Sequence, residues 1–142
     1  MSHDAVLSDA VCETFASLAF LDLMPSHSAV GKQEEPCVSI DVFEPLACNV
    51  SISIPALLLD EIAVSATGGE VEGEALEGAK RDLLLEVANV VAGAFAARVQ
   101  DAGAHVELGL PRLESPASSK TWQRFETESS WVDVSLELRS EH

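Results

Sequence analysis

Basic residues are scarce in this chain. Its 142 residues include 8 Lys and Arg against 24 Asp and Glu, which gives a net charge of −16. Nucleic-acid binding needs a basic surface that displaces counterions from phosphates, and an anionic membrane surface repels an acidic protein. We therefore expect no nucleic-acid or membrane partner, and we favour a protein partner that presents Lys or Arg.

Cysteine and histidine are also too scattered to form a known metal-binding motif. The cysteines are Cys12, Cys37 and Cys48. The histidines are His3, His27, His105 and His142. No CxxC motif or Cys/His cluster is present, and no two histidines have the spacing of ligands on a helix. The sequence thus predicts three reduced thiols in or near the core and no metal site.

Targeting segments and long apolar runs are absent too. The first residues, MSHDAVLSD, lack the basic region and apolar stretch of a signal peptide. The most apolar segment, residues 83–97, is too short to span a bilayer and carries a Glu and an Asn. We expect a soluble, cytoplasmic protein whose residues 1–142 form one domain.

Hydrophobic periodicity predicts a helix and then a hairpin in the first half of the chain. Apolar residues recur with helical spacing from about residue 4 or 8 to residue 23, shortly before a proline that ends the helix. Residues 37–43 and 50–54 alternate apolar and polar side chains, and Glu44-Pro45 between them indicates a turn. A proline then opens a short helix over residues 55–62.

The second half predicts a long helix followed by strands. Residues 65–78 are rich in glycine and glutamate and are typical of a solvated loop before a helix over residues 79–100. Strand patterns follow at 105–110, 120–127 and 131–138, the last with strict alternation. The fold class is α+β, with a mostly antiparallel sheet and two long helices packed on it.

The long helix carries an unusual polar strip. Between residues 83 and 97 only Glu86 and Asn89 are polar, and a spacing of three places them side by side. Asp82 and Gly93 continue the same stripe at steps of four. A glycine inside a helix costs about 0.5–1 kcal/mol relative to alanine, which indicates that a strand of the sheet or another protein comes close there. Plain packing of an amphipathic helix is the alternative.

The segment DLLLEVANVVAG, residues 82–93, matches the pattern Asp/Ser-x3-Glu-x2-Asn-x3-Gly. It resembles the signature of the CheC, CheX and FliY chemotaxis phosphatases. The order of helix, hairpin, short helix, Gly/Glu loop, motif helix and three closing strands is similar to CheX over nearly the whole chain. One difference is Ala94, where family members often carry Asn.

The first helix holds a degenerate copy of this pattern. Asp9 and Glu13 are in place, but Ala16 stands where the second copy has Asn, and Phe20 where it has Gly. The resemblance therefore implies a CheX-like state with one active helix per chain, in which Glu13 is not catalytic.

The resemblance implies a phosphatase that acts on the phospho-aspartate of a CheY-like response regulator. In this hypothesis Asn89 positions the attacking water and Glu86 pairs with a Lys of the regulator. Asp82 and Gly93 support the site or contact the partner. The chain needs no cofactor of its own, because the regulator supplies Mg²⁺, and a homodimer joined at sheet edges is implied.

Two other functions remain open at this point. The chain could be a CheX-like docking or scaffold module that binds a regulator without catalysis, and Ala94 leaves room for that. It could also be a generic hydrolase that uses the carboxylates of Asp82 and Glu86 on small phosphate esters.

Overall fold

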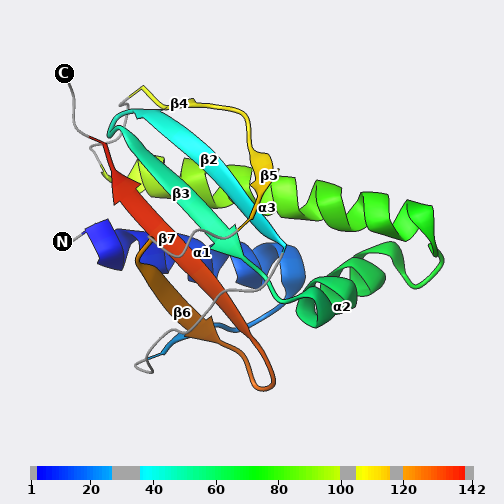
Figure 1. The fold of residues 1–142 in the computed structure, drawn as a ribbon. Helices are drawn as coiled ribbons and strands as arrows, with labels where there is room; N and C mark the ends of the chain where they lie inside the picture. Colours follow the sequence, from blue (N-terminus) through cyan, green and yellow to red (C-terminus); the bar gives the residue numbers. More distant parts are fainter. Residues whose placement is uncertain (1–2, 27–35, 100–104, 116–119, 140–142) are drawn as a thin grey trace.

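The computed structural model describes residues 3–26, 36–99, 105–115 and 120–139 (Figure 1). Its strands form one sheet in the order β1-β6-β7-β3-β2-β4, with β5 also paired to β2, and every pairing is antiparallel. The strands are β1 Met24–Pro25, β2 Cys37–Glu44, β3 Cys48–Ser53, β4 Glu107–Leu108, β5 Arg112–Glu114, β6 Trp122–Glu126 and β7 Trp131–Leu138. The helices are α1 His3–Ala19, α2 Ala56–Thr67 and α3 Glu74–Val99.

The two long helices, α1 and α3, lie side by side on one face of the sheet and run in opposite directions (Figure 1). The shorter α2 contacts α3. The predicted α+β class, with an antiparallel sheet and two long helices packed on it, is confirmed.

The apolar core lies between these helices and the sheet. Strand residues with a period of two and helix residues with a period of 3.6 turn their apolar side chains towards one another. Fully buried members are Val38, Ile40, Val42, Val50, Ile52 and Val134 of the sheet and Leu7, Val11, Phe15, Leu84, Val91 and Phe95 of the helices. Burial of each such side chain is worth about 1.5–3 kcal/mol, so the buried face of α3 fixes which face is exposed.

The predicted end of the first helix is wrong. We expected the helix to continue to residue 23, but α1 ends at Ala19 and Phe20 adopts a left-handed backbone with φ 55°. The N–H of Leu21 then donates to the carbonyl of Phe15 at 3.1 Å, which gives one of the last carbonyls of the helix a partner. The apolar side chain of Leu23 is still buried, but it lies on an extended segment rather than on a helix.

The predicted acidic loop, residues 65–78, is shorter than expected. The helix α2 continues to Thr67 and is capped by Gly68 in a left-handed conformation, with φ 70°. The helix α3 begins at Glu74, because Glu74 and Glu77 in its first turn favour the positive end of the helix dipole. The glutamates that indicated a solvated loop are therefore partly helical.

The strand predictions are correct for β2, β3, β6 and β7 within two residues at each end. The expected strand over residues 105–110 is reduced to the two residues of β4, and β5 was not predicted, because three residues after a proline carry no alternating pattern. The last strand, β7, lies between β3 and β6, so it is not an edge of the sheet.

The sheet face opposite the helices is polar, yet its centre is buried. Asn49 donates to the hydroxyl of Ser39 at 2.7 Å and to the carboxylate of Asp41 at 3.0 Å, and Lys120 donates to the amide oxygen of Asn49 at 3.2 Å. Buried polar groups need such partners, since an unpaired one keeps its full desolvation penalty.

The three cysteines are free, as predicted. Cys37 and Cys48 are buried, and burial raises the pKa of the Cys48 thiol to about 11. A thiol that stays protonated is a poor nucleophile, so Cys48 has a packing role.

None of the described helices combines the length and the apolar character needed to cross a membrane.

Candidate functional site

The predicted polar strip lies on the exposed face of α3. The side chains of Asp82, Glu86 and Asn89 are exposed, and Gly93 is half-buried. We call these four residues the α3 strip. The residues that alternate with them along the helix, including Val87, Ala88, Val91 and Ala92, are buried against the rest of the fold. The amphipathic packing of α3 therefore presents the strip outward.

Glu86 and Asn89 have no side-chain partner in the part of the chain that the structure describes. Among the described residues, neither side chain forms a hydrogen bond or an ion pair with another group. An amide and a carboxylate one turn apart with no internal partners keep all of their hydrogen-bonding capacity for another molecule. The solvated face of an amphipathic helix can carry the same residue types, so plain packing stays the alternative to a functional role.

Gly93 is not required by the chain's own packing. A Cβ atom added there would meet the Cδ1 of Leu108 in β4 at 3.9 Å, an ordinary van der Waals contact. We expected that either a strand of the sheet or a second protein approaches Gly93. The strand is present, and it leaves room for a side chain at this position.

Ion pairs hold both ends of α3 in place. Near its start, Lys80 lies 2.6 Å from Asp60 of α2 and 3.1 Å from Glu77, and these contacts raise the pKa of Lys80. Near its end, Arg98 pairs with Glu13 of α1. These ion pairs link the helix that carries the strip to both neighbouring helices.

The degenerate copy on α1 is built differently. Glu13 is engaged in the ion pair with Arg98, and Ala16 offers no polar atom on its side chain. Phe20 lies beyond the end of the helix. The amide and the glycine of the α3 strip are therefore absent from the corresponding positions of the first copy.

The side chains of Asp82, Glu86 and Asn89 lie on an exposed face of α3. Three cavities, of about 390, 300 and 290 Å³, are lined by other residues, and none of them includes Glu86 or Asn89. Small-molecule sites are usually concave, whereas an exposed helix face suits a macromolecular partner. This geometry disfavours the hydrolase that would act on small esters through Asp82 and Glu86.

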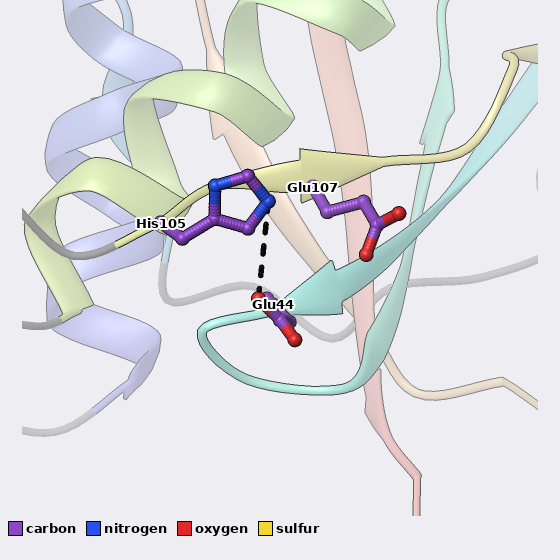
Figure 2. A group of neighbouring side chains, drawn as sticks. All are labelled: Glu44, His105 and Glu107. Atoms are coloured by element: carbon purple, nitrogen blue, oxygen red, sulfur yellow. Dashed lines mark ion pairs between the residues drawn. The ribbon is translucent and has the colours of Figure 1, made fainter.

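A second group of functional side chains was missed by the sequence analysis. Glu44, His105 and Glu107 come together where β4 pairs with β2, with ligand atoms within 4.8 Å of one another (Figure 2). A spacing of two on one strand could have paired His105 with Glu107, but only strand pairing brings Glu44 to them. The prediction of no metal site rested on helical spacing and did not consider this arrangement.

No protein-family model matches the sequence, and no curated protein matches it either. Solved structures do match. CheX from Desulfovibrio desulfuricans superposes with a TM-score of 0.78 at 12% identity, over 98% of this chain and 100% of that one. The chain has the CheX-like fold.

Two further structures share the CheX-like fold. A CheC-like superfamily protein from Shewanella sp. PV-4 has a TM-score of 0.77 at 18% identity, over 99% of this chain and 100% of that one. CheX from Borrelia burgdorferi, solved in a CheX–CheY–BeF3–Mg²⁺ complex, has a TM-score of 0.77 at 13% identity, over 98% and 99% of the two chains. The fold that the sequence resemblance implied is confirmed over nearly the whole chain.

Proposed function

We propose that this protein is a phosphatase that hydrolyses the phospho-aspartate of a CheY-like response regulator. The observation that carries the proposal is the exposed pair of Glu86 and Asn89, which has no partner within the described part of the protein. The segment that bears this pair resembles the signature of the CheX-type phosphatases. A protein of the same fold was solved together with CheY, which supports a regulator as the partner.

Asn89 is proposed to position the attacking water. The water oxygen forms a bond to phosphorus while the bond between phosphorus and the aspartate oxygen breaks. The aspartate leaves as a carboxylate, and the protons of the water pass to phosphate and solvent. The amide oxygen of Asn89 accepts a hydrogen bond from the water, and its NH₂ group donates. A neutral amide suits this task because the phosphoryl group would repel a carboxylate, and phosphoryl transfer depends mainly on positioning.

Glu86 is proposed to bind rather than to react. One turn from Asn89, its carboxylate can pair with a Lys beside the phospho-aspartate and hold the amide in register. Charge-assisted hydrogen bonds of this kind are stronger than neutral ones. Asp82 would support the same surface, and Gly93 would let the regulator backbone come close.

The chain is proposed to need no cofactor of its own, with Mg²⁺ supplied by the regulator. A cytoplasmic location is part of the same proposal. In this proposal the residues of the α3 strip bind the regulator and hold the attacking water in one position, and none of them forms a covalent bond with the phosphoryl group.

A homodimer joined at sheet edges is proposed as the assembly. One edge of the sheet is β1, and the other is formed by β4 and β5, which both pair with β2. Backbone groups at such edges are open to pairing with another strand. Size-exclusion chromatography with light scattering should give the mass of a dimer at micromolar concentration, and a monomer would contradict this assembly.

The function is tested by phosphate release from a phosphorylated CheY-like regulator of the same organism, with wild type and Asn89→Ala in parallel. We expect acceleration by wild type that disappears in the variant. Binding without acceleration would favour the docking module instead. Hydrolysis of small phosphate esters in the absence of any regulator would favour the two-carboxylate hydrolase.

A further inference from the structure

Glu44, His105 and Glu107 form a three-residue cluster at the end of the β2–β4 pair. All three side chains are exposed, and one ligand-type atom from each lies within 4.8 Å of the other two. Glu44 and Glu107 are directly opposite each other in the strand ladder. His105 lies two residues before Glu107, just ahead of β4, and its imidazole faces Glu44 (Figure 2). Strand pairing therefore brings Glu44 to Glu107, and His105 joins them from the segment that leads into β4.

The contact between His105 and Glu44 is a long one. Nε2 of His105 lies 3.9 Å from Oε2 of Glu44, which is within the range of an ion pair but too long for a hydrogen bond (Figure 2). Carboxylates placed directly opposite on neighbouring strands repel and destabilise the pair. A cation between them would remove that repulsion and give all three groups a common partner.

The spacing suits a small divalent ion. Two ligands bound to a tetrahedral zinc ion at normal bond lengths are about 3.4 Å apart. The His105–Glu44 separation of 3.9 Å exceeds this by about half an ångström, and all the ligand atoms lie within 4.8 Å of one another, so rotation of the exposed side chains is needed to bring them to bonding distance. Imidazole nitrogen combined with carboxylate oxygen favours zinc and similar transition metals over Mg²⁺ and Ca²⁺, which prefer oxygen ligands.

We propose that Glu44, His105 and Glu107 bind one divalent transition-metal ion of the zinc class, with water in the remaining positions. The ion bridges β2 and β4. The ladder between these strands pairs only Val42 with Leu108 and Glu44 with Glu107, so the ion would fasten the edge strand to the sheet. The site uses no residue of the α3 strip and is independent of the proposed phosphatase function.

The test uses the metal-free full-length chain titrated with Co²⁺, followed by visible absorption, and then with Zn²⁺ in competition. A protein with a net charge of −16 attracts divalent ions at many places, so variants must locate the binding. Loss of an outer-sphere partner already costs 10–100-fold in metal affinity, so His105→Gln and Glu107→Gln should each weaken binding at least about tenfold.

His3→Gln is the matched control, because His3 lies on α1, away from this cluster in the sequence and on a different element. Its affinity for Co²⁺ should equal that of wild type. Zn²⁺ should also raise the midpoint of thermal unfolding of wild type and of His3→Gln, but not of His105→Gln. Equal Co²⁺ affinity in wild type and His105→Gln, or no binding at millimolar Co²⁺, would overturn the proposal.

Discussion

The two long helices lie side by side and carry related patterns in different environments. On α3 the stripe reads Asp82, Glu86, Asn89 and Gly93. On α1 it reads Asp9, Glu13, Ala16 and Phe20. The Glu of α3 is exposed with no partner in the described residues, whereas the Glu of α1 pairs with Arg98. One stripe is thus available to a second molecule, and the other contributes to holding the first helix in place.

The last position of each stripe holds a residue that its backbone conformation does not favour: a glycine inside α3, and a phenylalanine in a left-handed conformation after α1. Gly93 lies inside a helix, where its flexibility costs stability, and the fold leaves space for a side chain there. Phe20, just after the end of α1, has the left-handed conformation that glycine adopts readily, and the residue is 87% exposed. For the stability of the fold alone, glycine would suit position 20 and alanine would suit position 93.

The largest expected effect comes from removing the amide of α3. Asn89→Ala should reduce regulator dephosphorylation by about a hundredfold, the loss typical of one positioned hydrogen-bonding group in a transition state. Binding to the phosphorylated regulator should remain within a fewfold of wild type. Phosphate release under single-turnover conditions checks the first expectation, and fluorescence anisotropy checks the second. Equal turnover in the two proteins would contradict a water-positioning role.

The second-largest effect is expected when the charge of Glu86 on α3 is reversed. Glu86→Lys places a cation against the proposed Lys of the regulator, and the lost pair together with the new repulsion should cost at least about 2 kcal/mol, or roughly thirtyfold in affinity. Asp9→Lys makes the same change of charge on the exposed face of α1 and is the matched control. A comparable loss in both variants would indicate a general charge effect rather than a specific contact.

The sequence predicted α3 and its strip well because the signal is local. Apolar residues with helical spacing fix the buried face, and a helix then places Glu86 and Asn89 together without any further information. The same reasoning failed at the end of α1. The apolar residues Leu21 and Leu23 extend the helical pattern, but Phe20 reverses the chain and they reach the core from an extended segment.

The features that could not be predicted depend on pairing between distant segments. The two-residue contact of β4 and the short β5 are stabilised by β2 and have no pattern of their own. For the same reason, Glu44 could not be connected with His105 and Glu107. The alternation of polar and apolar residues along β7 was predicted correctly. The burial of the polar residues Asp133 and Ser135 was not predicted. Asp133 is buried because Arg124 donates two hydrogen bonds to its carboxylate, at 2.8 and 3.0 Å.

The glycine of α3 offers a test in which stability and function move in opposite directions. Gly93→Ala should stabilise the free protein by about 0.5–1 kcal/mol, because alanine favours the helix and the added Cβ has room. The same methyl group should weaken regulator binding by roughly 1 kcal/mol, since an overpacked contact must rearrange. Urea unfolding and a binding titration measure the two effects. Gly93→Ala with unchanged binding would show that no partner approaches this position.

The aromatic residue after α1 gives the complementary test. Phe20→Gly should stabilise the protein by about 0.5–1 kcal/mol, because relief of a left-handed conformation worth about 1–2 kcal/mol is partly offset by the entropy of glycine. Little burial is lost, as the side chain is mostly exposed. Dephosphorylation should not change. Urea unfolding of Phe20→Gly next to Phe20→Ala, which keeps the strain, separates the backbone effect from the loss of the ring.

The smallest effect is expected for the glutamate of α1. Glu13→Ala removes the ion pair with Arg98, and the Glu13 side chain is 65% exposed, so the loss should be about 0.2–1 kcal/mol and should shrink at high salt. Dephosphorylation should stay within twofold of wild type, because the copy on α1 lacks the amide. If Glu13→Ala alone abolished activity in a protein that remains folded by circular dichroism, the two helices would both be functional. The ion pair that Glu13 forms with Arg98, and that Glu86 lacks among the described residues, would then not distinguish a structural glutamate from a functional one.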